Sequence, residues 1–463
     1  MIKQDTICAI ATAQGGAIGI IRVSGPQAIE ITSGIFTPFK GKPLQEREAY
    51  TLTFGQITNA TGEVIDEVLV SVFKNPHSYT GEDSTEIMCH GSSYILQQVM
   101  KRLIENGCRS ALPGEYTQRA FLNGKMDLSQ AEAVADLIAS SSAATHRLAM
   151  SQMRGGFSKE LSVLRDKLLH LTSLMELELD FSDHEELEFA DRSELRTLAE
   201  EIAGVISRLA NSFNVGNAIK NGVPVAIIGE TNAGKSTLLN ALLNEEKAIV
   251  SDIHGTTRDV IEDTINLRGI TFRFIDTAGI RQTTDTIESL GIERSFQKMD
   301  QANIILWMID STCKEDFEAL KESILPHCEG KSLILLFNKC DQLAETDRSA
   351  LLQHFVDVEA PKLFIAAKQR INMDQLEEEL IQTAALPEIS QNDVIVTNIR
   401  HYEALTKALE SIQRVQEGMD FGLSGDLISE DLRQCIYYLS DIVGDVSTDE
   451  VLGNIFKNFC VGK

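Results

Sequence analysis

The sequence lacks long apolar runs, paired cysteines and any excess of basic residues. No apolar stretch approaches the ~18 residues that cross a membrane, so we expect no membrane-embedded segment. The eight cysteines include no CxxC pair, which argues against a zinc site or a disulfide framework and favours reduced thiols. The opening residues MIKQDTICAI show no signal-peptide pattern. Together these absences predict a cytoplasmic protein.

Basic residues are scarce relative to acidic ones. The 42 lysines and arginines stand against 68 aspartates and glutamates, which gives a formal net charge of −26. This charge disfavours a broad surface that coats nucleic acid, so RNA would have to bind a local patch or a basic partner. Acidic residues are densest over residues 175–195, a pattern typical of a solvated helix or linker.

Three sequence patterns follow one another along the chain. Residues 1–124 mix β-rich runs with glycine and proline turns, which predicts an N-terminal α+β domain. Residues 125–219 and 387–463 repeat apolar residues at helical spacing, whereas residues 220–386 alternate strand-like and helical segments. The predicted fold class is therefore multidomain α/β. We expect one helical domain made from two chain segments, with an α/β domain and its mainly parallel sheet inserted between them.

The stretch GETNAGKST, residues 229–237, has the frame of a phosphate-binding loop. An apolar strand-like run precedes it at residues 225–228, and a helical pattern follows it. Backbone N–H groups and the helix N-terminus would hold the phosphates, Lys235 would reach the outer ones, and Ser236 would coordinate Mg²⁺. The predicted phosphate contacts are Asn232, Ala233, Gly234, Lys235, Ser236 and Thr237.

Two further motifs follow in the order expected of a GTPase. DTAG stands at the end of the strand-like run 270–275, where an aspartate can hold Mg²⁺ through water and a glycine N–H can approach the γ-phosphate. NKCD follows another apolar run, and a carboxylate there accepts hydrogen bonds from the N1–H and exocyclic amine of guanine, which adenine does not offer. The predicted residues are Asp276, Thr277, Ala278 and Gly279, then Asn338 for the other base edge, Lys339 for the ring face, and Asp341 for guanine.

The base-contacting SAK motif of GTPases is matched by Ala366-Ala367-Lys368, without the serine. Because the contacts of that motif are largely made by the backbone, we expect Ala367 and Lys368 still to line the base. The stretch AIVSDIHGTTRDV, residues 248–260, supplies Thr257 as the second Mg²⁺ ligand, although alone it would read equally well as an ordinary glycine and threonine turn.

The glutamine that positions the attacking water in small GTPases is absent, because Ile280 follows DTAG. Two residues could replace its function. Asn232 offers a side-chain carbonyl that could help to ligate a monovalent cation, which would stabilise developing charge. Glu288, in RQTTDTIESLGIERS, could orient the water; alternatively it is a surface residue of a charged helix.

Several stretches outside these motifs resemble one family along the whole chain. They are TICAIATAQGGAIGIIRVSG, HSYTGEDSTEIMCHG, PGEYTQRAFLNGKMDLSQAEAVADLI, GTTRD and the terminal CVGK. On these stretches the chain resembles the MnmE (TrmE) family of bacterial tRNA-modification GTPases. The resemblance implies an N-terminal folate-binding and dimerisation domain at 1–124, a helical domain in the parts 125–219 and 387–463, and an inserted Ras-like G domain at 220–386.

The resemblance also implies an activity and its partners. The chain would be a potassium-activated GTP hydrolase that forms a homodimer and joins the flavoprotein MnmG in a heterotetramer. Together they would add a carboxymethylaminomethyl-type group at C5 of the wobble uridine of certain tRNAs. One carbon would come from 5-formyltetrahydrofolate or a related tetrahydrofolate.

Residue roles follow from the same resemblance. It implies Mg²⁺ on Ser236 and Thr257 and Glu288 as the catalytic residue that orients water. Taken alone, the residues implied for folate would read as surface charges or structural ion pairs, and the Cys460 thiol either takes part in the modification or packs in the tail. The implied K⁺ ligands are Asn232, Ser251, Ile253 through its carbonyl, and Thr256, and the implied folate residues are Arg22, Glu86, Lys125 and Lys463.

A GTP-driven assembly switch, such as a ribosome-maturation factor without modification chemistry, is the alternative. Such proteins share the phosphate loop, an apolar residue after DTAG, and NKxD. They more often carry a basic RNA-binding appendage, whereas this chain is acidic and carries a folate-like domain and a tail with a cysteine. The sequence therefore favours the modification enzyme.

Overall fold

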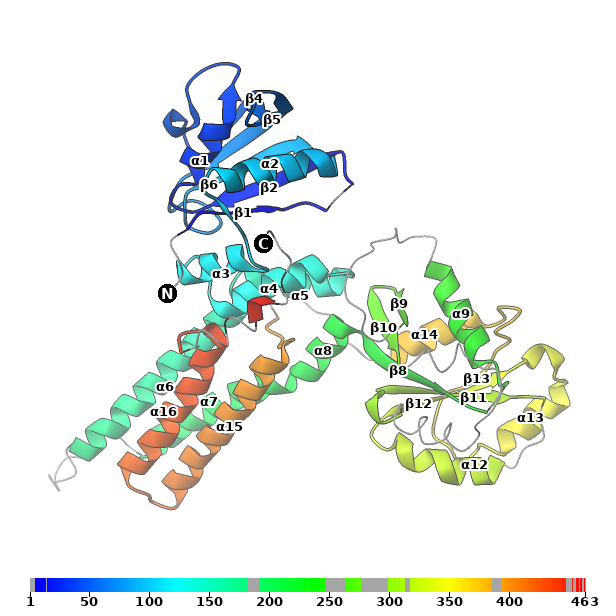
Figure 1. The fold of residues 1–463 in the computed structure, drawn as a ribbon. Helices are drawn as coiled ribbons and strands as arrows, with labels where there is room; N and C mark the ends of the chain where they lie inside the picture. Colours follow the sequence, from blue (N-terminus) through cyan, green and yellow to red (C-terminus); the bar gives the residue numbers. More distant parts are fainter. Residues whose placement is uncertain are drawn as a thin grey trace. The chain divides into compact units, whose positions relative to one another are not determined.

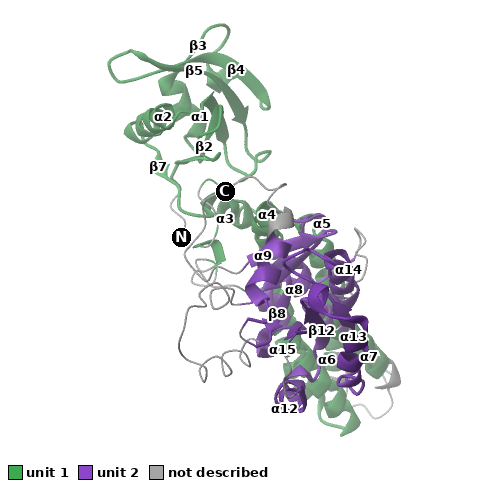
Figure 2. Cartoon of the chain, turned by 90° about the vertical axis from the view of Figure 1, so that its right-hand side faces the viewer, with its two compact units in different colours: residues 1–139, 149–207, 403–463 green, residues 140–148, 208–402 purple. Residues whose placement is uncertain are grey.

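The structure is a computed structural model, and it divides the chain into two compact units. Unit 1 comprises residues 1–139, 149–207 and 403–463, and unit 2 comprises residues 140–148 and 208–402 (Figure 2). The described residues are 5–13, 15–180, 192–230, 232–246, 263–275, 299–312, 317–384 and 393–446, with 452, 455–457, 459 and 462.

Unit 1 begins with a seven-stranded sheet in the order β3-β4-β5-β6-β2-β1-β7 (Figure 1). Its neighbouring strands are antiparallel except β1 and β7, which run parallel. The strands are β1 Ile7–Ile10, β2 Ile18–Ser24, β3 Phe36–Pro38, β4 Thr51–Thr58, β5 Val64–Phe73, β6 Ser84–His90 and β7 Arg109–Ser110.

Two helices, α1 (Ala28–Ile35) and α2 (Ser93–Glu105), cover one face of this sheet. Alternate residues of β5, including Val68 and Val70, point into the core beneath them, as the two-residue period of a strand requires. The helix α3 (Glu115–Leu122) follows β7, and a 3₁₀ turn η1 spans Leu44–Glu46. This α+β domain is the one that the sequence predicts.

The rest of unit 1 is helical and comes from the end of the stretch 1–139 and from the stretches 149–207 and 403–463 (Figure 1). The longest helix, α6, buries Leu161, Leu164, Leu168 and Leu171, so buried positions alternate at spacings of three and four. That spacing is the seam of helices packed side by side in a bundle. The helices wholly in unit 1 are α4 Leu128–Ala139, α6 Gly156–Asp180 and α16 Gly425–Val443; those divided between the two units are α5 Ala143–Met153, α7 Arg192–Asn211 and α15 Ile399–Asp420.

Ion pairs connect four of these helices in a closed ring. They join α6 to α7, α7 to α15, α15 to α16, and α16 back to α6. This ring is the arrangement expected of a four-helix bundle. The pairs are Lys167–Glu201, Arg196–Asp420, Arg414–Asp431 and Arg433–Glu176.

Unit 2 contains a six-stranded sheet in the order β13-β12-β11-β8-β10-β9. All neighbouring strands are parallel except the β9–β10 hairpin. The strands are β8 Val223–Ile228, β9 Asp263–Leu267, β10 Ile270–Phe274, β11 Ile304–Asp310, β12 Ser332–Asn338 and β13 Lys362–Phe364, and the helices are α8 Phe213–Asn221, α9 Lys235–Glu246, α12 Phe317–Ile324, η2 Leu325–Cys328, η3 Cys340–Gln342, α13 Glu345–Gln353 and α14 Met373–Ala384.

Helices cover both faces of this second sheet. Ile227 packs with α9 and α14 on one face, while its neighbour Ile228 packs with α12 and α13 on the other. Burial on both faces explains the continuous apolar runs of these strands. The fold class predicted from the sequence is thus confirmed, including the strands β8, β10 and β12 and the helix α9 at the GTPase motifs. Among the described residues, no helix is long and apolar enough to cross a membrane.

Candidate active site

The phosphate-binding loop joins β8 to α9 and depends on two glycines. Gly229 has φ +142°, and a Cβ there would lie 2.1 Å from the carbonyl oxygen of Met308. Gly234 has φ +104°, and its Cβ would lie 2.3 Å from Nδ2 of Asn338. Any side chain at either position would displace the loop, so both glycines are required by conformation and by space. The loop is therefore a cradle lined by backbone.

Lys235 is the first residue of α9. Its Nζ donates to the carbonyl oxygens of Gly229 (2.5 Å) and Glu230 (2.7 Å), so the ammonium lies over the loop. Ser236 and Thr237 stand in the first turn of the helix, where the N–H groups and the helix dipole favour an anion. Asn232 adopts a left-handed backbone conformation, with φ 67°. That these residues contact phosphates stays a prediction.

Asn338 connects the phosphate loop to the predicted base loop. Its side chain is 4% exposed, with Nδ2 donating to the carbonyl of Ala233 (2.7 Å) and Oδ1 accepting from the N–H of Ala367 (3.0 Å). The prediction that Asn338 also serves a base edge stays a prediction, since Nδ2 carries two hydrogens and the bond to Ala233 uses one of them. The residue brings the phosphate loop, NKCD and the Ala366-Ala367-Lys368 stretch into one site.

Lys339 is held by a carboxylate that the sequence reading did not identify. Its Nζ lies 2.5 Å from Oδ2 of Asp310, at the end of β11. The other oxygen, Oδ1, accepts from the backbone N–H and the hydroxyl of Thr312. Burial alone would raise the pKa of Asp310, but the hydrogen bonds from Lys339 and Thr312 outweigh it and lower that pKa. Asp310 therefore stays ionised and fixes the position of Lys339.

Asp341 stands at the surface of the same loop, in the 3₁₀ turn η3. Its Oδ2 accepts a hydrogen bond of 2.8 Å from Nε2 of Gln369. Lys368 is exposed beside Gln369, whereas Ala367 is buried and contributes its backbone N–H. The two halves of the predicted base site thus lie against each other.

Arg22 and Glu86, both predicted for folate, face each other on the neighbouring strands β2 and β6. Nη2 of Arg22 lies 2.8 Å from Oε1 of Glu86, and the side chains are 23% and 20% exposed. The guanidinium also lies 5.6 Å from the ring centre of Tyr79 and 5.7 Å from that of Tyr116. Such contacts hold an arginine in one orientation. The pair is therefore a fixed element of the N-terminal domain.

The C-terminal tail reaches this pair. Nη1 of Arg22 lies 3.5 Å from the carbonyl oxygen of Gly462. Gly462 has φ +96°, and a Cβ there would lie 2.6 Å from the carbonyl oxygen of Ile10, so only glycine fits. Lys125 is exposed and donates from Nζ to the carbonyl of Pro76 (2.9 Å), on the loop that carries Tyr79.

Comparison with known proteins gives matches over nearly the whole chain. Residues 6–125 match the family described as GTP-binding protein TrmE N-terminus, and residues 128–460 match the MnmE helical domain. The chain belongs to the MnmE family. It is 72% identical to the tRNA modification GTPase MnmE of Phocaeicola vulgatus and 52% identical to that of Flavobacterium johnsoniae, and both alignments cover 100% of each chain.

Among solved structures, the chain is similar to a GTP-binding protein from Sulfolobus solfataricus in complex with GDP. The identity is 17% with a TM-score of 0.27, over 48% of this chain and 66% of that one.

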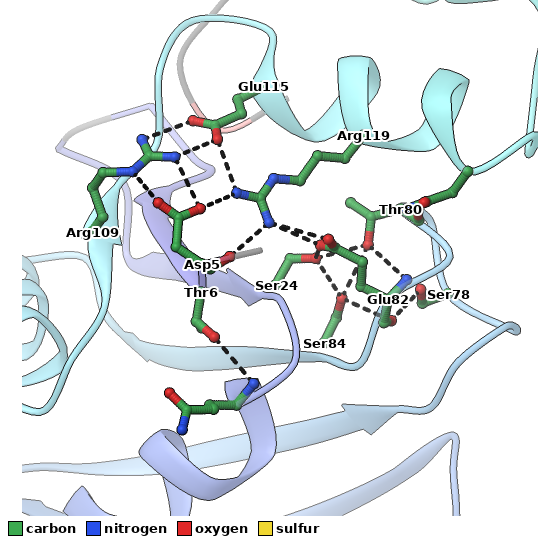
Figure 3. A network of polar contacts seen from close by, with 12 residues as sticks. Asp5, Thr6, Ser24, Ser78, Thr80, Glu82, Ser84, Arg109, Glu115 and Arg119 are labelled. Carbon is green, nitrogen blue, oxygen red and sulfur yellow. Dashed lines mark hydrogen bonds and ion pairs between the residues drawn. The ribbon is translucent and has the colours of Figure 1, made fainter. Parts of the chain in front are cut away.

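A buried ion-pair network in this MnmE-family chain was missed by the sequence reading (Figure 3). Arg119 is 2% exposed and binds Asp5, Glu82 and Glu115. Arg109 binds Asp5 (2.7 Å) and Glu115 (2.5 Å) as well. The stretch PGEYTQR supplies Glu115 and Arg119 at i and i+4 on α3, a spacing that could have suggested a pair.

This network joins α3 to the start of the chain and to the loop before β6. The hydrogen bonds from Arg109 and Arg119 lower the pKa of Asp5 to about 2, because they outweigh the opposing effect of burial. Asp5 is therefore ionised at neutral pH. The GED and PGEYTQR stretches of the MnmE family thus have a structural function here, because they supply the buried charges and their partners.

Several predicted residues of this MnmE-family chain lie outside the described residues. Within the part of the chain that the structure describes, no group of three or more His, Cys, Asp or Glu side chains could hold a metal ion. The predictions outside it concern Ser251, Ile253, Thr256, Thr257, Asp276, Thr277, Ala278, Gly279, Glu288, Cys460 and Lys463.

Proposed function

We propose that this chain is a potassium-activated GTP hydrolase that modifies the wobble uridine of certain tRNAs together with a flavoprotein of the MnmG type. Membership of the MnmE family supports GTP hydrolysis and a role in tRNA modification. The observation that carries the nucleotide site is Asn338, whose side chain joins the phosphate loop to the base loop. The group added would be of the carboxymethylaminomethyl type, at C5 of uridine.

GTP fits the residues that surround this loop. The cradle that a Cβ at Gly229 or Gly234 would fill can admit phosphate oxygens against backbone N–H groups. Lys235 would neutralise the outer phosphates, and Asp341 would accept from the guanine edge. Lys339, held by Asp310, would cover the face of the base.

The remaining parts of the GTPase centre are proposed from sequence. Mg²⁺ would be held by Ser236 and Thr257, with Asp276 acting through water. K⁺ would be held in part by Asn232, and a bound cation there supplies charge stabilisation at the phosphates. Because Ile280 cannot orient water, Glu288 would do so. The full set of proposed K⁺ ligands is Asn232, Ser251, Ile253 and Thr256.

We place the folate site at Arg22 and Glu86. A carboxylate suits the aminopyrimidine edge of a pterin, and cations suit the glutamyl carboxylates of a tetrahydrofolate. The contact of Gly462 with Arg22 supports this placement, because Gly462 is the sequence neighbour of Lys463, which the family resemblance implies for folate. Lys125 would serve as a further cation.

The N-terminal sheet supports a homodimer. Its face opposite α1 and α2 exposes Leu52 (59%), Phe54 (50%) and Leu69 (39%), with Phe54 and Leu69 directly opposite each other on β4 and β5. A second copy of this chain would bury such a face. The flavoprotein would complete a heterotetramer in the cytoplasm and would carry much of the tRNA contact, because this chain is acidic.

Equilibrium dialysis of the full chain against labelled 5-formyltetrahydrofolate tests the folate part. The wild-type chain should retain the label, and R22A should lose at least about tenfold in affinity because it removes the fixed guanidinium. R102A is the matched control, since Arg102 forms an ion pair with Glu105 on α2 of the same domain. A wild-type chain that retains nothing would contradict the folate site and favour a GTP-driven switch without modification chemistry.

A further inference from the structure

The loop after β13 is bonded tightly to the NKCD loop. The N–H of Ile365 donates to the carbonyl of Phe337 (2.9 Å), and the N–H of Cys340 donates to the carbonyl of Ile365 (3.1 Å). The N–H of Ala367 donates to Oδ1 of Asn338 (3.0 Å). These three bonds fix the loop against the NKCD loop, which carries the proposed guanine carboxylate Asp341.

The same loop is closed on itself by a short bridge. Ala366 and Ile371 exchange two backbone hydrogen bonds of 3.2 Å, and the N–H of Gln369 donates to the carbonyl of Ala366 (3.1 Å). Arg370 and Asn372 adopt left-handed conformations, each with φ 58°, which complete the turn. The backbone therefore holds Gln369 at a defined position.

At this position the Gln369 side chain meets the predicted guanine carboxylate. Its Nε2 donates to Oδ2 of Asp341 at 2.8 Å, and only a donor can make this contact with an ionised carboxylate. Ala366, in the position of the usual serine, has no side-chain donor of its own. Gln369 thus supplies a hydrogen bond to Asp341 that the motif itself does not.

We propose that Gln369 is a positioning residue for guanine selectivity. This inference rests on the proposed assignment of Asp341 as the carboxylate that receives the N1–H and exocyclic amine of guanine. Both contacts require the carboxylate plane to face the edge of the base. An exposed aspartate without a partner rotates about its side-chain torsions, whereas the bond from Gln369 limits that rotation.

The test is competition of GDP, IDP and XDP against fluorescent mant-GDP on the full-length chain. IDP lacks the exocyclic amine, so it keeps the N1–H contact alone. Q369A should weaken GDP about three- to tenfold, as loss of one hydrogen bond predicts, and should weaken IDP less, so that the GDP/IDP preference falls. KM for GTP should rise with kcat unchanged. Q342A is the matched control, because Gln342 is exposed next to Asp341.

A second variant separates this inference from the site on which it rests. D341N replaces an acceptor by an amide donor, so it should lose GDP and gain XDP, which carries a carbonyl at C2. If D341N fails to change the base preference, both the assignment of Asp341 as the guanine carboxylate and the positioning role of Gln369 are wrong. D341N can change the base preference while Q369A does not behave as proposed. Gln369 has no positioning role if Q369A binds both nucleotides like wild type, weakens GDP and IDP equally, or binds GDP more tightly.

Discussion

Replacing Arg119 with alanine should destabilise the N-terminal domain severely. The Arg119 side chain is 2% exposed, and it donates to Oδ1 of Asp5 (2.7 Å), Oε1 of Glu115 (3.0 Å) and Oε1 of Glu82 (3.1 Å). Removing it leaves Glu115, 7% exposed, without one of its two arginines. Loss of one partner from a buried ion pair typically costs about 3–5 kcal/mol, because the remaining charge stays desolvated. We expect at least about 3 kcal/mol here.

A matched variant and the single tryptophan make this prediction specific. R165A breaks the exposed pair of Arg165 with Asp445, whose side chains are 47% and 48% exposed, and should cost about 0–1 kcal/mol. Urea unfolding followed by far-UV circular dichroism should show the loss in R119A. Trp307 lies in β11 of unit 2, so its fluorescence transition should stay unchanged. An R119A transition within about 1 kcal/mol of wild type would refute the reasoning about the buried network.

Four further perturbations test the position of Lys339, the charge of Asp5, the proposed potassium site and the proposed homodimer. D310A should weaken GDP binding about tenfold, because it releases Lys339. The affinity is measured by competition with mant-GDP, and the affinity of D310N should lie between those of D310A and wild type. Because the folded-state pKa of Asp5 is about 2, below its ordinary 3.8, its ion pairs stabilise the fold above about pH 4. Stability should therefore fall as pH drops from about 4 towards 2, and the D5N variant should show less of this acid dependence in urea titrations. GTP turnover should be faster in KCl than in NaCl at equal ionic strength, and N232A should abolish the difference. F54D should dissociate the proposed homodimer in sedimentation velocity without lowering the thermal midpoint of the monomer.

Much of the GTPase domain could be predicted from the sequence. Apolar runs of strand length, each ending in a motif, locate β8, β10 and β12 because parallel strands in a covered sheet are buried on both faces. The glycines of the phosphate loop also follow from local rules, since Gly229 and Gly234 have positive φ. Local sequence patterns are therefore sufficient to predict these strands and the glycines of the loop.

Contacts between distant segments could not be predicted in the same way. Asp5 and Arg119 are separated by 114 positions, and no periodic pattern relates them. Asp310 and Gln369 lie outside the motifs, and their functions depend on which strand ends the sheet places side by side. Asn338 shows the same limit, because its motif does not predict that its side chain bonds two loops.

The most direct test of the proposed function is nucleoside mass spectrometry of bulk tRNA from cells with and without this gene. The deletion should lose a carboxymethylaminomethyl-type uridine, and the wild-type gene should restore it, whereas a D341N gene should not because GTP binding is lost. An unchanged nucleoside profile in the deletion, in cells without a second copy, would contradict the modification function and leave a GTP-driven switch.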